Sequence, residues 1–495
     1  MKKMTFRKLF GGLCCAAMVA FAASCAQGAD DESWSAGVTN SELEAPTIDD
    51  SCFEVVSTSS GDVIKLTWPV VYGAGGYHVT VYEEANPETA LVDEDVDGQT
   101  ITFPMVEDTN FNISVTTLGN DRYNNKQSEA GAYTFSTFGT LCEIPNGSDI
   151  AEWIKANYVA PEKEIFGLVY QLAAGGQYTL NSVVDFNLDK VMLRTADASN
   201  PATVTVNGDG YFMTQAGLKI LNVKFDCTAS TASGFIAMGA TPDPSLANTA
   251  LGYTGGNSGY FLVLKPIIVE NVWIKNLPKA LLYDNQQKWG VKDFRILNCL
   301  IQCNNTSGDS FLNFYKAGGV IRDMTIQNNT IWNIAKNGSA YFIRFNNGSN
   351  SQKVFGANSS VQSNLNHVWD HNTIAKMFTG KDFGNNMPTR ANAYFTMTNN
   401  NFFDVFRLYQ YLQNNATTHC KDNAIWYVEA SPQSNDTGGR KPDTGDAYFA
   451  LQEEGTTPNA NAADLPVLDL NAENGGADFK ASGALSSTVG DPRWL

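Results

Sequence analysis

The stretch "IQNNTI", residues 326–331, places two asparagines between isoleucines in a segment that otherwise alternates like a β-strand. Asparagine is depleted in strands because its short amide competes for backbone hydrogen bonds and favours turns. We therefore interpret the segment as a corner. Ile326 ends one strand, Asn328 and Asn329 turn the chain, and Ile331 enters the next strand.

The same six-residue pattern recurs along the chain, as "ILNVKF" from 220, "VENVWI" from 269, "ILNCLI" from 296, "WDHNTI" from 369, "MTNNNF" from 397 and "CKDNAI" from 420. Its sixth position is always apolar, and its third position is Asn222, Asn271, Asn298, Asn328, His371, Asn399 or Asp422. Successive matches lie 23 to 49 residues apart. The shortest steps suit one coil of a β-solenoid, and the longer steps suit a coil with an inserted loop.

Other repeat architectures need marks that this chain lacks. A propeller blade needs about four strands per ~40 residues, and a leucine-rich repeat needs an LxxLxL frame. Stacked coils instead place equivalent residues ~4.8 Å apart, so that like side chains form ladders. We expect the third-position amides to form such a ladder, hydrogen-bonded above and below, at corners with left-handed backbone.

With this repeated asparagine corner and its apolar sixth position, the chain resembles the pectate-lyase-like right-handed parallel β-helix superfamily. The segment "NGSDIAEWIKANY" from 146 predicts a short amphipathic helix with Ser148 as its N-cap, and the superfamily has a helix capping the N-terminal end. The closing "GDPRWL" resembles the C-terminus of β-helix lipoproteins of Bacteroidota carbohydrate-utilisation type. We expect an all-β chain with the β-helix at 140–495, including a loop-rich tail from 429.

Residues 45–139 alternate in short strands such as "VIKLTWPV" from 63 and "FNISVTTLG" from 111, which predicts a β-sandwich of about a hundred residues. With Trp68 in an early strand, this part resembles a fibronectin type III domain. The acidic "DEDVDG", residues 93–98, is interpreted as a hairpin turn, because Pro104 stands where a calcium loop needs its bidentate glutamate.

The first residues are basic and then apolar, which is typical of a signal peptide at 1–24. The ending "FAASC" resembles a bacterial lipobox with Cys25 as the lipidated residue, although an ordinary signal with an incidental cysteine gives the same pattern. The acidic residues behind Cys25 resemble a Bacteroidota surface-export signal. These features predict a flexible tether at 25–44 and a cell-surface protein of the outer membrane, with membrane contact through the N-terminal lipid only.

The formal net charge of −18 argues against nucleic acid as a partner. An anionic glycan would need a local basic patch or bridging cations. The cysteines after Cys25 form no CxxC pair, and the chain has only four histidines, so no metal site is predicted. Cys52 and Cys142 could pair, or could be buried thiols like the others.

Candidate site residues lie on strands that follow the asparagine corners: "SFLNFY" from 310, "AYFIRF" from 340 and "DVFRLYQY" from 404. Alternation sends Leu312, Phe314, Ile343, Phe345, Phe406 and Leu408 inward, and Asn313, Tyr315, Arg344, Arg407, Tyr409 and Tyr411 outward. The resemblance implies a substrate cleft on this face. Arginine forks match carboxylates, and tyrosines offer flat faces to sugar rings. A merely solvated sheet face would have the same pattern.

A second basic stack comprises Lys265, Lys292 and Arg322, the last two followed by Asp293 and Asp323. It is either a second site or a structural ladder of ion pairs. His371 stands at a ladder position within "VWDHNTI", so we interpret it as structural rather than catalytic.

We expect a surface lipoprotein that binds a polysaccharide, with a uronate-containing, pectin-like glycan as one candidate, and that needs no cofactor. Outer-membrane glycan-uptake proteins are the partners that such a protein would have. One alternative is a polysaccharide lyase, with Arg344 or Lys292 as the base and Ca²⁺ assisting. Hydrolysis would need two facing carboxylates, and the strands offer only Asp309 and Asp404. A structural or adhesive protein is the third alternative.

Overall fold

The computed structural model describes residues 37–58, 61–162, 166–255, 259–357, 363–389, 392–411, 417–426, 450–451, 465–472 and 487–495. The chain divides into two compact units, residues 1–139 and 140–495. Cys25 and most of the tail from 429 lie outside the described residues. In the described part of the chain, no helix has both the length and the apolar character needed to cross a membrane.

The first unit is an antiparallel β-sandwich, as predicted. One sheet contains β1 (Phe53–Thr58), β2 (Gly61–Thr67) and β5 (Thr100–Pro104), and the other contains β4 (Asn86–Val96), β3 (Gly76–Glu83), β6 (Asn110–Leu118) and β7 (Gly131–Ser136). Trp68 is buried edge-on against Tyr77, with ring centroids 5.4 Å apart. The hairpin prediction for 93–98 is wrong in part, because Asp93 and Asp95 lie within strand β4 and flank His78 on β3.

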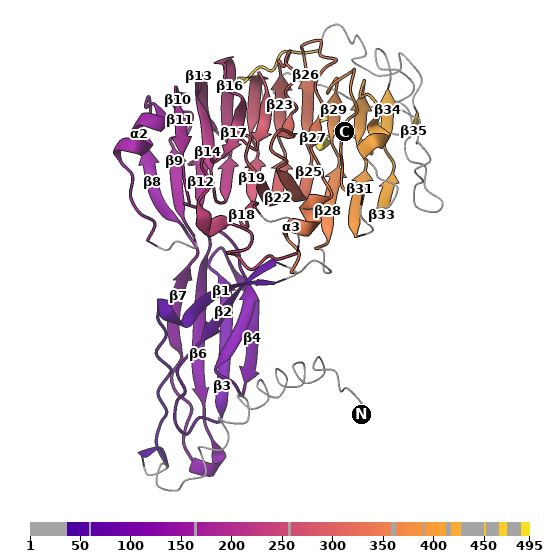
Figure 1. The fold of residues 1–495 in the computed structure, drawn as a ribbon. Coiled ribbons are helices and arrows are strands. Elements are labelled where there is room, and N and C mark those ends of the chain that lie inside the picture. Colours follow the sequence, from indigo (N-terminus) through magenta and orange to yellow (C-terminus); the bar gives the residue numbers. More distant parts are fainter. Residues whose placement is uncertain are drawn as a thin grey trace, which may run out of the picture. The chain divides into compact units, whose positions relative to one another are not determined.

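The second unit is a parallel β-helix, which confirms the fold-class prediction (Figure 1). Three long parallel sheets run along it. Sheet 1 contains β33 (Thr417–Lys421), β31 (Ala393–Thr398), β28 (Leu365–Asp370), β25 (Val320–Gln327), β22 (Trp289–Leu297), β19 (Ile267–Glu270), β15 (Leu218–Leu221), β12 (Val191–Thr195), β9 (Leu168–Leu172) and β8 (Thr140–Ile144), with β18 (Phe261–Val263) beside β22.

Sheet 2 contains β10 (Gln177–Leu180), β13 (Ala202–Gly208), β16 (Val223–Ser230), β20 (Trp273–Leu277), β23 (Leu300–Cys303), β26 (Thr330–Asn333), β29 (Thr373–Ala375), β32 (Asn401–Phe403), β34 (Ala424–Trp426) and β35 (Ala450–Leu451). Sheet 3 contains β11 (Val183–Asp185), β14 (Tyr211–Thr214), β17 (Gly234–Met238), β21 (Ala280–Tyr283), β24 (Leu312–Phe314), β27 (Ile343–Phe345) and β30 (Gly384–Asn385). Each full coil visits sheets 1, 2 and 3 in that order.

The asparagine corner joins sheet 1 to sheet 2. Strand β25 ends at Gln327 and β26 begins at Thr330, so Asn328 and Asn329 turn the chain as expected. Every third-position residue has the predicted left-handed backbone: φ is 57° at Asn222, 51° at Asn271, 56° at Asn298, 58° at Asn328, 53° at His371, 57° at Asn399 and 56° at Asp422.

The amide ladder, however, lies one residue later than predicted. The fourth position carries Asn329, Asn372, Asn400 and Asn423, all fully buried, and each side chain donates to the next one along at 2.9, 2.8 and 2.9 Å. The third-position side chains are half-buried or exposed, whereas the fourth-position amides are fully buried. One rung does exist there, from Asn328 Nδ2 to Asn298 Oδ1 at 3.1 Å, whereas His371 pairs with Asp370 at 2.9 Å.

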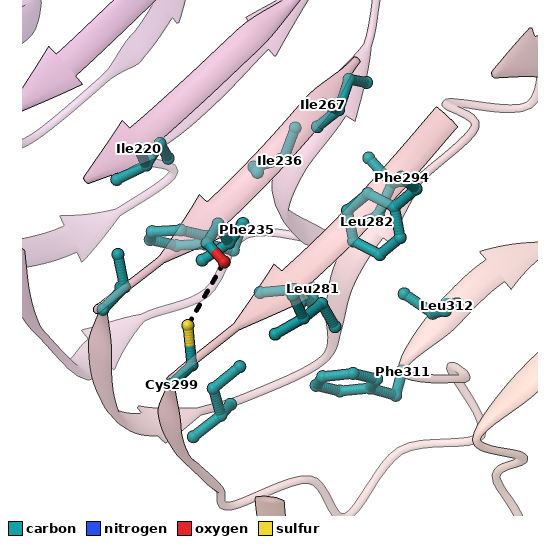
Figure 2. Packing of buried hydrophobic residues seen from close by; sticks show 14 of the residues in the cluster. Ile220, Phe235, Ile236, Ile267, Leu281, Leu282, Phe294, Cys299, Phe311 and Leu312 are labelled. Carbon is teal, nitrogen blue, oxygen red and sulfur yellow. Dashed lines mark hydrogen bonds between the residues drawn. The ribbon is translucent and has the colours of Figure 1, made fainter. Parts of the chain in front are cut away.

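Apolar ladders fill the interior. The sixth-position residues Phe225, Ile274, Ile301, Ile331, Ile374 and Phe402 are fully buried and lie in register on successive strands of sheet 2. Figure 2 shows side chains of the other sheets meeting in this core, with Ile236, Leu282 and Leu312 in register on sheet 3. Burying one such side chain contributes about 1.5–3 kcal/mol.

The helix α2 (Ile150–Ala156) contacts β10 and β11 at the first coils. Its N-cap is Asp149 rather than Ser148: the Asp149 carboxylate accepts the N–H of Glu152 at 2.9 Å, whereas the Ser148 hydroxyl donates to a carbonyl. Cys52 and Cys142 are free thiols in different units, so the pairing that the sequence allowed is absent.

Candidate functional site on the outer face of sheet 3

The outer face of sheet 2 is covered by the C-terminal segment. Residues 465–470 and 489–494 pack on Leu300 and Trp332, and the short helix η9 (Pro492–Trp494) holds Trp494 against Thr330, whose hydroxyl accepts the indole N–H at 2.7 Å. Part of the outer face of sheet 1 is covered in turn by Tyr260, Leu262, Val354 and Phe355. The outer face of sheet 3 is therefore the candidate surface for a ligand site.

Neighbouring strands of sheet 3 place one outward column in register: Tyr283 on β21, Asn313 on β24, Arg344 on β27 and Asn385 on β30. The column arises from strand alternation, because the residues on either side of Arg344, Ile343 and Phe345, are fully buried in the core. Asn313 and Arg344 are in register on neighbouring strands and point to the same face of sheet 3, as the prediction requires.

Arg344 is the central side chain of this face. Its guanidinium carbon lies 3.5 Å from the ring centroid of Tyr315 and 4.9 Å from that of Tyr341, so the cation is held against two aromatic faces. Its Nε has no hydrogen-bond partner among the described residues. Tyr315 is exposed, as predicted. The rings orient the guanidinium of this half-buried side chain, and its Nε is buried.

A polar hollow of about 460 Å³ lies beside Arg344, around β30. Its lining includes Asn346, Asn347, Asp382, Asn385 and Asn386. Asn386 donates to the Phe345 carbonyl at 3.0 Å, which fixes the wall, whereas the side chains of Asn346, Asn347 and Asn385 make no hydrogen bond to any residue that the structure describes. Such amides offer both donors and acceptors to a ligand.

The third predicted strand, from 404, is not a strand. Residues Leu408–Tyr411 form the short helix η6, and β30 (Gly384–Asn385) takes the expected place in sheet 3. Arg407 has a left-handed φ of 47°, and its Nη1 pairs with Asp382 Oδ1 at 3.0 Å. Leu408 is buried as expected, but Phe406 is only half-buried. Arg407 thus lies next to the hollow, with its charge already paired.

Tyr411 was predicted to face solvent, and this prediction is wrong. Its side chain is fully buried, and its hydroxyl lies 2.8 Å from Nδ1 of buried His367. The helix η6 turns Tyr411 into the interior, where a strand would have turned it outward. The side chain of Tyr409 lies outside the described residues.

Asn313 is only 8% exposed, because Tyr283 and Arg344 flank it on the neighbouring strands. Its Nδ2 approaches Asp309 Oδ1 at 3.4 Å. Asp404 is fully buried rather than on the face. Asp309 and Asp404 therefore do not form the exposed carboxylate pair that hydrolysis would need.

The second basic stack lies on another sheet. Lys292 is on β22 of sheet 1, so the two candidate bases, Lys292 and Arg344, are not brought together. Arg322 pairs with Asp323 as the ion-pair interpretation predicts. Asp293, however, pairs with Arg295 instead of Lys292. Among the described residues, no group of three or more His, Cys, Asp or Glu side chains could hold a metal ion.

Sequence reasoning missed Tyr341, Asp382 and the hollow. The pairs Asn346–Asn347 and Asn385–Asn386 line the hollow, but nothing in the sequence indicates that the two pairs meet. Tyr341 lies just before the strand that carries Arg344, where alternation gives no direction for a side chain.

Two family models match the chain. Residues 1–174 match DUF4992, described as a domain of unknown function, and residues 176–334 match DUF4957, also described as a domain of unknown function. No curated protein matches the chain. Among solved structures, a pectate lyase from Pectobacterium carotovorum is similar at 10% identity, covering 76% of this chain and 86% of its own, with a TM-score of 0.13. The fold assignment rests on the strand pairing of this chain and not on that likeness.

Proposed function

We propose that the protein binds a polysaccharide on the outer face of sheet 3. The observation that carries this proposal is the guanidinium of Arg344, oriented by Tyr315 and Tyr341 and bordered by the amide-lined hollow. Sugar rings present an apolar face to aromatic side chains and hydroxyl groups to amides, and an acidic sugar presents a carboxylate to arginine. The resemblance of the repeat to pectate-lyase-like β-helices supports the same ligand class.

The residues favour binding over cleavage. β-Elimination needs a group that accepts a proton, and arginine stays protonated in proteins, which makes Arg344 a better carboxylate ligand than a base. Lys292, the other candidate base, is on sheet 1. Asp404 is buried, so Asp309 and Asp404 do not form the facing pair that hydrolysis would need. Lyase activity is the second outcome that the experiment below distinguishes.

We further propose that the chain is a lipoprotein anchored through Cys25 at the surface of the outer membrane. The sandwich, whose seven strands form sheets of three and four, would be a fibronectin type III-like spacer. Outer-membrane proteins that take up glycans would be its partners. These proposals rest on the sequence pattern of the first 44 residues and on the strand order of the sandwich.

Gel retardation and absorbance test the binding proposal together. The purified protein is incubated with pectins, alginate and glycosaminoglycans, with and without Ca²⁺, while absorbance reports unsaturated uronates. We expect retardation without new absorbance. New absorbance would replace the binding proposal with a lyase, and a panel with neither signal would favour the adhesive alternative.

Variants locate the site. Losing a charge-assisted hydrogen bond costs about 1.5–3 kcal/mol, so Arg344→Ala should weaken binding by about 10- to 100-fold. Arg295→Ala is the matched control, because it removes a partly exposed arginine from sheet 1. Lys292→Ala tests the second basic stack. Unchanged binding in Arg344→Ala together with loss in Lys292→Ala would move the site to sheet 1.

A further inference from the structure

Charge varies from strand to strand along the face of sheet 3. At β27, Arg344 is a cation without an ion pair to any described carboxylate. One strand further, at β30, Asn385 contributes a neutral amide. One strand back, at β24, Asn313 lies against the Asp309 carboxylate, so that side of Arg344 is acidic.

The second arginine of this region does not extend the positive charge. Arg407 is paired with Asp382, which lines the hollow, so a ligand there meets a neutralised ion pair and neutral amides. The chain as a whole carries a formal charge of −18, which repels polyanions that find no compensating cations. The face can therefore compensate one negative charge at Arg344, and the Asp309 carboxylate opposes a second negative charge on the β24 side.

The spacing of the strands sets the spacing of ligand groups. Adjacent strands lie about 4.8 Å apart, close to the length of one sugar ring, so a glycan lying across the strands presents successive rings to successive side chains of the column. A carboxylate next to the one bound by Arg344 would face Asp309 on one side or the amide hollow on the other. The contact with Asp309 brings like charges together and selects against a ligand that has a carboxylate at that position.

On the basis of the proposed function, we infer that the ligand is a glycan whose acidic sugars alternate with uncharged sugars. A polymer with a carboxylate on every ring fits the face less well. The inference concerns the pattern of charge and not the identity of the sugars.

Isothermal titration calorimetry of the full chain with oligosaccharides of equal length tests this inference. One probe alternates glucuronate with N-acetylglucosamine, a second alternates galacturonate with rhamnose, and a third is an oligogalacturonate. We expect at least one alternating probe to bind about tenfold or more tightly than the oligogalacturonate. Reducing the carboxyl groups of the alternating probe to alcohols should remove that advantage in the wild type. The same reduction should change the affinity of Arg344→Gln little.

A gain-of-binding variant avoids the ambiguity of a misfolded protein. Asp309→Asn keeps the shape of the side chain next to Asn313 and removes its negative charge. We expect it to bind the oligogalacturonate several-fold more tightly and the alternating probe unchanged. Asp422→Asn removes an exposed carboxylate from a corner between sheets 1 and 2; it is the control and should change neither affinity.

The outcomes separate the inference from the function on which it rests. An oligogalacturonate that binds as tightly as the alternating probes, through Arg344, overturns the inference and keeps glycan binding on sheet 3. Unchanged oligogalacturonate affinity in Asp309→Asn also counts against the inference. If no probe binds and the polymers in the retardation assay also fail, the proposed function itself is overturned.

Discussion

Replacing Asn372 with alanine removes four hydrogen bonds from the buried amide ladder. The side chain donates to the Ile326 carbonyl at 2.6 Å and to Asn400 Oδ1 at 2.8 Å, and it accepts the backbone and side-chain N–H groups of Asn329 at 3.1 and 2.9 Å. A typical hydrogen bond contributes about 0.5–1.5 kcal/mol net, and buried groups left unpaired cost more. We therefore expect Asn372→Ala to lower the free energy of unfolding by about 4 kcal/mol.

The neighbouring corner provides a matched control. Asn328 has a φ of 58° and makes one side-chain hydrogen bond in its ladder position, to Asn298. Glycine adopts this backbone readily, so Asn328→Gly should cost only about 1 kcal/mol. Both variants change an asparagine at equivalent corners of neighbouring coils, but only Asn372 belongs to the buried amide ladder.

Urea unfolding followed by circular dichroism measures the two changes, and hydrogen exchange locates them. In Asn372→Ala, the amides of Asn329 and of the adjacent corners should exchange faster, while the sandwich stays as protected as in the wild type. If Asn372→Ala unfolds no more easily than Asn328→Gly, the buried amide ladder does not stabilise the stacked coils.

Three further predictions concern other parts of the β-helix. Arg493 donates to three carbonyls of the corners, so Arg493→Ala should lower the melting temperature in calorimetry, and an unchanged value would mean that the C-terminal segment does not clamp the coils. Burial lowers the pKa of His367 from 6.5 to about 3, so the unfolded chain takes up a proton on this histidine at a higher pH than the folded chain does. The free energy of unfolding should therefore fall as the pH drops from about 6.5 to 3. His367→Gln should flatten this pH dependence, and a pH profile identical to that of the wild type would contradict the prediction. Tyr411→Phe should cost about 1 kcal/mol of stability and leave glycan affinity unchanged, whereas weaker binding would return Tyr411 to the site.

The sequence was sufficient to predict the corners, because left-handed backbone restricts the third position to asparagine and a few substitutes. The apolar sixth position likewise predicted the core ladder of sheet 2. The buried amide ladder was assigned one residue too early. In a run such as Asn328–Asn329, the sequence does not indicate which of the two amides is buried. In the first coils the fourth position is valine, at 223 and 272, so no asparagine pattern is visible there.

The candidate site was predicted only where a regular strand carries it. Arg344 and Tyr315 follow strand alternation, so their positions could be read from the sequence. Arg407 and Tyr411 lie at the two ends of a helical turn instead of on a strand. Arg407 forms an ion pair, and Tyr411 is buried in the core. The hollow is formed by loops from two coils, and no local pattern in either loop indicates that they meet.

Hydrogen exchange with and without a bound glycan shows whether the ligand occupies the outer face of sheet 3. The protein is compared with and without a saturating oligosaccharide selected from the calorimetric panel. We expect slower exchange in residues 311–316, 341–347 and 382–389, which carry Arg344 and the hollow, and no change at the C-terminal residues 487–495. Protection confined to sheet 1 or to the sandwich, with the sheet 3 segments unchanged, would contradict it.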